Sequence, residues 1–139
     1  MIRINGKSII DYLLLTIYYS STMKEQLKIR TKVFAHNCIK LKQSFPNTYL
    51  SNHIKGQLIR CSTSVAANYR ATCIAQSKPS FIAKISIVIE EMDESHFWLE
   101  FALDENLISK ENVTFLLKEA SELTAIFMAS RKTASSNNQ

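Results

Sequence analysis

The sequence has few of the residues that shape turns: its 139 residues include only two glycines and two prolines. Hairpins and crossover connections between strands depend on such residues, so their scarcity argues against a β-rich fold. A chain of this length suffices for one domain with one hydrophobic core. The composition therefore predicts a single all-α domain.

Cysteine is also scarce, and its spacing argues against two common uses. Cys38, Cys61 and Cys73 form no CxxC pair, and an odd number leaves one thiol over in any disulfide scheme. This pattern fits a reducing compartment better than a secreted one. We expect buried thiols and a cytoplasmic location.

The sequence lacks the residue patterns that support catalysis or cofactor binding. It has no glycine-rich phosphate loop, no redox CxxC and no Ser/His/Asp arrangement with supporting spacing. Carboxylate-bridged di-iron bundles require two Glu-x-x-His motifs, and only residues 93–96, Asp-Glu-Ser-His, come near one. His36 and His53 lie outside any such motif. We expect a protein that is not an enzyme and holds neither a metal nor a cofactor.

Charges of one sign are missing from long parts of the chain, although the net charge is only +5. Residues 24–44 carry six basic and one acidic side chain, and residues 50–77 carry three basic and none acidic. Residues 78–105 carry two basic and seven acidic side chains. This distribution suits binding of polyanions, or pairing of basic and acidic faces between helices or subunits. Charges that are solvated or paired internally are the simpler explanation.

Four helical segments follow Met23. The first three cover residues 24–44, 50–76 and 80–105, and Ser109 caps the fourth. Pro46 ends the first segment, because proline disfavours helix just before it. Ser77 serves as the N-cap of the third.

The third segment has apolar or small residues at the heptad spacing that aligns one helix along another. They are Phe81, Ile85, Val88, Met92, Ser95, Leu99 and Ala102. Asn106 can adopt the left-handed conformation that ends such a helix. Long helices and short loops predict an antiparallel up-down-up-down four-helix bundle over residues 23–134, with a disordered tail at 135–139.

The first 22 residues form a separate segment, in which Asp11 interrupts an apolar run. The remaining run from Tyr12 to Tyr19 is shorter than the stretch of about 20 apolar residues that crosses a bilayer. We therefore predict no membrane partner. Because Met23 directly precedes the lysine-rich start of a helix, we interpret residues 1–22 as an extension and expect the native protein to begin at Met23.

Small and hydroxylated residues occupy much of the second helix between Gln57 and Thr72. Antiparallel pairing with the third helix would place Ser62 to Val65 opposite Glu91 to Glu94, with Arg60 within reach of Glu94. The small side chains would let the two helices approach closely. Their hydroxyl groups would satisfy the carboxylates, which are costly to bury without partners.

Two interpretations of this polar layer are open. In the structural one, the layer fixes which helices pair and in what alignment. In the functional one, Asn68, Tyr69 and Arg70 belong to a surface that meets a partner, because Tyr and Arg are favoured interface anchors. Phe97 and Trp98 are interpreted as core and intersubunit packing. The layer or interface comprises Arg60, Ser64, Asn68, Tyr69, Arg70, Lys84, Glu91, Glu94 and Trp98.

Three segments occur in a characteristic order: TKVFAHNCIKL, QLIRCSTSVAANYRAT and AQSKPSFIAKISIVIEEMDESHFWLE. Their SxxAN, SKxxFxxK and ExxES-FWLE motifs resemble a bacterial family of four-helix-bundle proteins first recognised in intervening sequences of 23S ribosomal RNA genes. The resemblance covers Met23 to about Arg131. It implies a ring-like homopentamer with a central channel and no known enzymatic activity. It also implies kinship with the accessory variability protein of diversity-generating retroelements, a basic pentamer that binds nucleic acid.

The leading hypothesis is a non-catalytic oligomer that binds RNA or DNA through phosphate contacts, which a ring would multiply. The sequence has no RNP-type aromatic motif, GXXG loop or zinc pattern, so binding would be mainly electrostatic. The candidate contacts are Lys24, Lys28, Arg30, Lys32, Lys40, Lys42 and Lys55. The alternative is a homo-oligomeric scaffold or adaptor for a protein partner, without nucleic acid.

Overall fold

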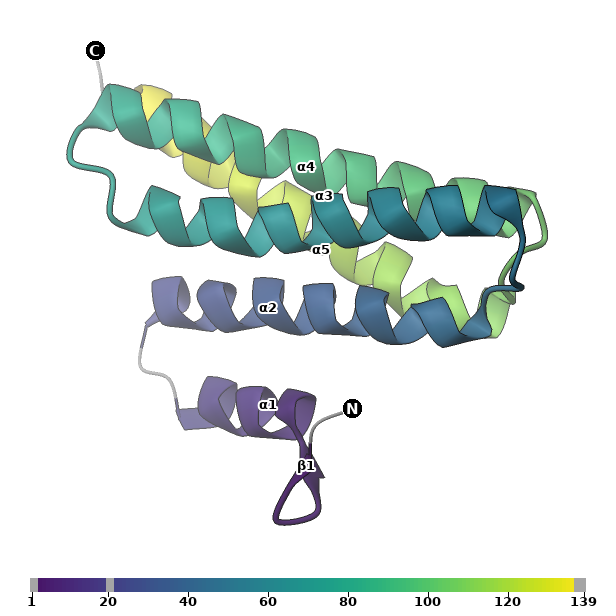
Figure 1. The fold of residues 1–139 in the computed structure, drawn as a ribbon. Coiled ribbons are helices and arrows are strands. Elements are labelled where there is room, and N and C mark those ends of the chain that lie inside the picture. Colours follow the sequence, from purple (N-terminus) through teal and green to yellow (C-terminus); the bar gives the residue numbers. More distant parts are fainter. Residues whose placement is uncertain (1–2, 20–21, 137–139) are drawn as a thin grey trace.

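A computed structural model describes residues 3–19 and 22–136 of the chain (Figure 1). The described residues form five α-helices, one short 3-10 helix and one pair of two-residue strands. In chain order these are β1 (Arg3–Ile4), β2 (Lys7–Ser8), α1 (Ile9–Tyr19), α2 (Met23–Leu41), η1 (Lys42–Ser44), α3 (Tyr49–Cys73), α4 (Lys78–Asp104) and α5 (Lys110–Ser136). The expectation of an all-α fold is confirmed, with one helix more than the sequence predicted.

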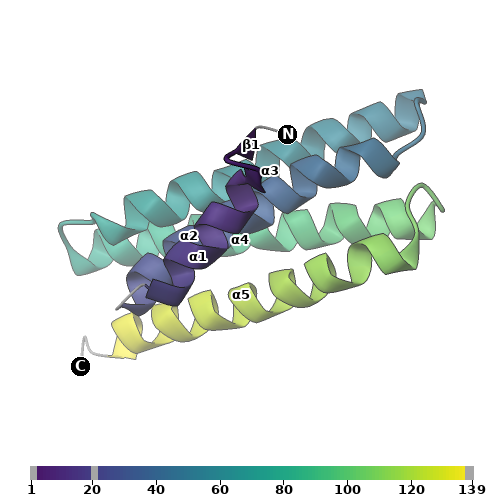
Figure 2. The ribbon, with the colours of Figure 1, turned by 90° about the horizontal axis from the view of Figure 1, so that it is seen from below.

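The four long helices, α2 to α5, lie side by side around a shared core (Figures 1 and 2). Short connections reverse the chain, so each long helix runs antiparallel to the next (Figure 1). The helix α2 packs against α3 and α5, and α4 packs against the same two helices. The helices α2 and α4 therefore lie at opposite corners. Contact between α2 and α5 is thinner than contact between α2 and α3.

Heptad spacing correctly predicted the core side of α4. Six of the seven positions are buried, namely Ile85, Val88, Met92, Ser95, Leu99 and Ala102. Phe81, near the start of α4, is only partly buried. Val33 and Ile39 of α2 are also partly exposed, because each is offset by one residue, about 100° of helical turn, from buried Phe34 and Cys38. Each large apolar side chain buried in this core stabilises the fold by about 1.5–3 kcal/mol.

Local hydrogen bonds set the ends of the long helices. The side-chain oxygens of Thr22, Thr48 and Ser77 each accept a hydrogen bond of 3.2 Å from the backbone N–H three residues later. Of these three caps, only the one at Ser77 was predicted; α5 begins at Lys110, directly after the Ser109 that was predicted to cap it. Asn106 has the expected positive φ of 56°, and the next backbone N–H donates to the Ala102 carbonyl at 2.9 Å.

Two predicted helix ends are displaced. The helix α3 ends at Cys73, three residues before the predicted end. The helix α5 continues to Ser136, two residues into the segment that was expected to be disordered. Residues 137–139 of that predicted tail lie outside the described residues.

The segment before Met23 forms a small hairpin and a helix. Asn5 and Gly6 connect β1 to β2 with φ angles of 50° and 80°, which suits a two-residue hairpin turn, so the scarcity of glycine did not exclude a hairpin here. Ser8 and Asp11 cap α1 reciprocally: the Ser8 N–H donates to Asp11 Oδ2 at 2.9 Å, and the Asp11 N–H donates to Ser8 Oγ at 3.2 Å. The helix α1 packs along α2 (Figures 1 and 2). The native start at Met23 stays a prediction.

The helices in residues 3–19 and 22–136 differ in length and polarity. The apolar helix α1 has 11 residues, whereas the four long helices carry many charged side chains. None of these helices has the combination of length and apolar character that crossing a bilayer requires.

Candidate functional site

Basic side chains recur along α2 at multiples of four residues. Residues four apart in a helix lie one above the other, so these side chains form a row that winds slowly around α2. We call Lys24, Lys28, Lys32 and Lys40 the α2 lysine row; His36 fills the gap between the last two. Lys28 is partly buried, and the other three lysines are exposed.

Two members of the α2 lysine row already bind groups within the chain. Lys24 Nζ donates to the Cys73 carbonyl at 3.3 Å, where the last carbonyls of α3 attract a cation. Lys28 Nζ lies 3.0 Å from Glu25 Oε1, and an ion pair this exposed stabilises by less than about 1 kcal/mol. Lys32 and Lys40 make no hydrogen bond or ion pair with any described residue. The row therefore has cations that a phosphate group can reach.

Two further candidates lie near the connection from α2 to α3. Lys42 is exposed in η1, and Lys55 is partly buried in the second turn of α3. Within the described parts of the chain, neither side chain pairs with another residue. They extend the basic surface beyond Lys40 toward this end of the molecule.

Arg30, which the sequence grouped with these lysines, has a different environment. Its guanidinium group binds Glu119 of α5 through two hydrogen bonds, of 2.9 and 3.0 Å, and binds Glu122 Oε1 at 3.0 Å. The hydrogen bonds to Glu119 are the main cause of the raised pKa of Arg30. Arg30 therefore joins α2 to α5 where their packing is thin, and it is already neutralised by carboxylates. A phosphate contact by Arg30 would have to break this link.

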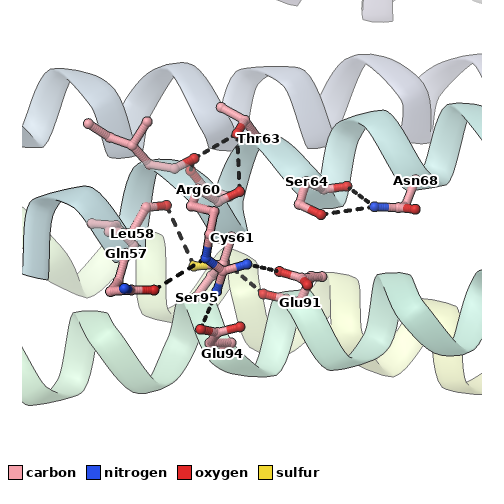
Figure 3. Close-up of polar contacts among 12 residues, drawn as sticks. Gln57, Leu58, Arg60, Cys61, Thr63, Ser64, Asn68, Glu91, Glu94 and Ser95 are labelled. Carbon is pink, nitrogen blue, oxygen red and sulfur yellow. Dashed lines mark hydrogen bonds and ion pairs between the residues drawn. The ribbon is translucent and has the colours of Figure 1, made fainter.

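The polar layer between α3 and α4 is centred on Arg60 (Figure 3). Arg60 Nη1 lies 3.2 Å from Glu91 Oε2, and Arg60 Nη2 binds Glu94 Oε1. Gln57 Oε1 accepts a third hydrogen bond, from Arg60 Nε at 3.2 Å. The hydrogen bond from Arg60 is the main cause of the lowered pKa of Glu94, to which Trp98 also contributes. The predicted pairing of Arg60 with Glu94 is confirmed.

The predicted alignment of α3 with α4 is confirmed, but the predicted role of the hydroxyl groups is wrong. Ser95 Oγ of α4 donates to Cys61 Sγ of α3 at 3.2 Å, and Ser62 of α3 is fully buried. The Thr63 hydroxyl donates to the Ile59 carbonyl at 2.7 Å, and Ser62 Oγ donates to the same carbonyl at 3.4 Å. A hydroxyl can always reach a carbonyl of its own helix one turn earlier, so it needs no carboxylate.

The Asn-Tyr-Arg sequence of α3 is split between core and surface. Asn68 Nδ2 donates to the carbonyl and to Oγ of Ser64, both at 2.9 Å (Figure 3). Tyr69 is only 7% exposed, and its ring centroid lies 5.1 Å from that of Phe127. Burial raises the pKa of Tyr69. The interpretation of Tyr69 as a surface anchor is therefore wrong, because its ring belongs to the core.

Arg70 and Lys84 are two further predicted site residues whose side chains are not paired with any residue that the structure describes. Arg70 is exposed on α3, and Lys84 is partly buried on α4. Neither makes a hydrogen bond or an ion pair with a described residue. The interpretation of Arg70 as part of a surface that meets a partner therefore stays a prediction.

An aromatic cluster surrounds Trp98, and the sequence analysis did not predict it. The Trp98 ring lies with its centroid 5.0 Å from Phe97, 5.7 Å from His53 and 6.0 Å from Phe101. Its Nε1 donates to Glu94 Oε1 at 3.4 Å. Phe97 is 49% exposed and is therefore not a core residue, whereas Trp98 is partly buried against the core; intersubunit packing of these rings stays a prediction. The spacing of Phe101, four residues after Phe97, was the available signal for such a cluster.

The cysteines and histidines form no recognisable reactive site. Within the described part of the chain, no three His, Cys, Asp or Glu side chains are grouped so that they could hold a metal ion. Cys38 and Cys61 are buried as expected, whereas Cys73 is only partly buried. Burial raises the pKa of the Cys38 and Cys61 thiols, so both stay protonated and unreactive at neutral pH.

Comparisons with known proteins agree on one family. The sequence model described as 23S rRNA-intervening sequence protein matches residues 25–129. A solved structure from Bacteroides thetaiotaomicron, described as a protein of unknown function from the S23 ribosomal protein family, is similar with a TM-score of 0.70 and 26% sequence identity. That similarity covers 76% of this chain and 98% of the other. None of the curated proteins matches the sequence.

Proposed function

The chain belongs to the 23S rRNA-intervening sequence protein family, and we propose that it binds nucleic acid through phosphate contacts of the α2 lysine row. The availability of this row carries the proposal. Lys32 and Lys40 are exposed and unpaired among the described residues, and Lys28 needs only to exchange Glu25 for a phosphate. From Lys24 to Lys40 the row extends along about 24 Å of helix, which spans several successive phosphate groups.

The contacts available on α2 favour binding that does not depend on base sequence. Lysine ammonium groups act on phosphates as point charges and carry no information about the bases. The aromatic cluster around Trp98 lies mainly on α4, at the opposite corner from α2, so it does not act together with the α2 lysine row. We infer electrostatic binding of RNA or DNA by a protein that does not catalyse a reaction.

We further propose that α2 to α5 form the bundle unit of a ring-like homo-oligomer. One copy offers only a few unpaired lysines on α2, which would bind nucleic acid weakly. Several copies in one ring would raise the overall affinity through their high effective concentration. The pentameric ring and the kinship with retroelement accessory proteins stay predictions, and sedimentation velocity of the full chain would measure the subunit number.

A matched pair of charge-reversal variants tests the nucleic-acid proposal. One variant changes Lys28, Lys32 and Lys40 to Glu, and the control changes Lys110, Lys118 and Lys132 of α5 to Glu, with the same change in net charge. Fluorescence anisotropy with a labelled RNA duplex should show at least about tenfold weaker binding for the α2 variant and a much smaller change for the control. Equal losses would contradict the assignment to α2. Absence of wild-type binding at low salt would overturn the proposal.

A scaffold or adaptor without nucleic acid is the second candidate. The aromatic cluster around Trp98 favours it, because Phe97 exposes about half of its surface there, and exposed aromatic rings are typical of protein interfaces. The absorbance ratio at 260 and 280 nm of the protein purified at low salt separates the two candidates. Copurified nucleic acid supports the first candidate, and nucleic-acid-free protein supports the second.

A further inference from the structure

The outward side of α4 surrounds an exposed ring with carboxylates. Phe97 is 49% exposed. Its neighbours on the helix surface, three, four or seven residues away, include five acidic side chains. These are Glu90, Asp93, Glu94, Glu100 and Asp104.

Most of this negative charge is not neutralised by other residues that the structure describes. Glu94 binds Arg60, and Glu100 Oε1 lies 3.6 Å from His96 Nδ1. Glu90, Asp93 and Asp104 are exposed and make no hydrogen bond or ion pair with any described residue. On α4 itself, residues 85–109 contain no lysine or arginine, and the cation that α3 contributes, Arg60, is already bound to Glu91 and Glu94. This side of α4 therefore has a negative local potential.

The rings on this side form one continuous surface. Phe97, Trp98 and Phe101 of α4 contact one another, with ring centroids 5.0 to 6.0 Å apart, and His53 of α3 packs edge-on against Trp98. Leu99 and Met92 already fill the core side of the same helix. The half-exposed Phe97 ring is thus not needed to complete the core, whereas Trp98 and Phe101 are partly buried against it.

We propose that this acidic aromatic face, defined by Glu90, Asp93, Phe97, Trp98, Phe101 and Asp104, binds a lysine- or arginine-rich helical segment of another protein. Charge complementarity selects this partner: its cations would pair with the free carboxylates and lie over the rings, while its apolar side chains would cover Phe97. The same carboxylates repel phosphates, so nucleic acid does not fit here. Because α2 lies at the opposite corner, the α2 lysine row stays accessible.

Trp98 makes the proposal directly measurable, because it is the only tryptophan of the chain. The probe is a synthetic 20-residue helical peptide without tryptophan, with lysines along one side and leucines along the other. Titration into the full-length protein should shift the Trp98 fluorescence in a saturable way. Phe97→Ala, and separately the triple variant Glu90→Gln, Asp93→Asn, Asp104→Asn, should each weaken binding at least about tenfold.

Two matched variants on α5 serve as controls. Phe115→Ala removes a ring that is 54% exposed, and Glu111→Gln removes an exposed carboxylate, both outside the face. Both should leave the affinity for the peptide unchanged. Circular dichroism should confirm that every variant keeps its helix content, so that a loss of binding is not a loss of fold.

Four results would overturn the proposal. The first is no saturable binding of the peptide by the wild type, and the second is equal weakening of binding by Phe97→Ala and Phe115→Ala. The third is equal affinity of the wild type for a peptide with serines in place of the leucines. The fourth is a sedimentation mass that is lower than that of the wild type for Phe97→Ala and for no other variant. The last result would assign the face to a second copy of this chain. The α4 variants should bind the RNA duplex as the wild type does, so failure here is separable from failure of the nucleic-acid proposal.

Discussion

The helices α2 and α4 share one core but present opposite chemistry to the solvent. The α2 lysine row is basic, whereas the acidic aromatic face of α4 carries unpaired carboxylates around the half-exposed ring of Phe97. Both helices pack against α3 and α5, so the two surfaces point to opposite corners of the molecule. Arginines pair with glutamates inside the fold, whereas the charges left unpaired among the described residues are positive on α2 and mainly negative on α4.

A similar device anchors each of these helices to a neighbour. In both cases an arginine binds two glutamates that are spaced three residues apart on a neighbouring helix. Arg30 of α2 binds Glu119 and Glu122 of α5. Arg60 of α3 binds Glu91 and Glu94 of α4. The Arg30 side chain is 24% exposed, whereas that of Arg60 is 48% exposed. The anchor of α2 should therefore be the stronger of the two.

The shared core should give the largest effect. Phe127→Ala removes a fully buried ring that packs on Tyr69, and it should lower the free energy of unfolding by about 3–5 kcal/mol. The control Phe115→Ala, on the same helix but exposed, should change it by less than about 0.5 kcal/mol. Urea unfolding followed by circular dichroism measures both. Similar decreases in the free energy of unfolding for Phe127→Ala and Phe115→Ala would contradict the burial of Phe127 in the core that α2 and α4 share.

The anchor of α2 should give an intermediate effect. Arg30→Ala leaves Glu119 and Glu122 without their cation and should lower the free energy of unfolding by about 1–2 kcal/mol. Arg30→Lys keeps the charge but cannot make the two parallel hydrogen bonds to Glu119, so it should recover only part of the loss. Full recovery by lysine would show that charge alone, without the geometry, holds α2 to α5.

The anchor of α4 should give the smallest effect, and one that depends on pH. Arg60→Ala should lower the free energy of unfolding by less than about 1 kcal/mol at neutral pH, because the pair is exposed. The folded pKa of Glu94 lies below its ordinary value of 4.5, so the stabilisation is present above pH 4.5 and lost as the pH falls through the lowered pKa. The difference from the wild type should shrink over that range; a constant difference would contradict the pairing.

Residue spacing predicted those parts of the fold that depend on neighbours along the chain. The heptad of α4, the cap at Ser77 and the left-handed Asn106 follow from local pattern. The pairing of Arg60 with Glu94 follows from one short connection, which fixes the alignment of α3 with α4. The burial of Tyr69 could also have been predicted, because Tyr69 lies four residues after the buried Val65, on the same side of α3.

Other features depend on contacts that no local pattern encodes. Arg30 binds Glu119 and Glu122 across the interface between α2 and α5. These two helices are not consecutive in the chain, so no short connection sets their alignment. The hairpin before α1 had a local signal in Asn5 and Gly6, which the overall scarcity of glycine outweighed. The exposure of Phe97 follows from the packing of α4 as a whole, because aromatic residues are common in cores as well as on binding surfaces.

The most direct test of two separate surfaces is the salt dependence of duplex DNA binding by three proteins. These are the wild type, the α2 variant with Lys28, Lys32 and Lys40 changed to Glu, and the α4 variant Glu90→Gln, Asp93→Asn, Asp104→Asn. The wild type and the α4 variant should show the same slope of log affinity against log salt. The α2 variant should be less steep by about 2.7, at about 0.9 per lost phosphate contact. Equal slopes for all three proteins, or a changed slope for the α4 variant, would contradict the separation of the two surfaces.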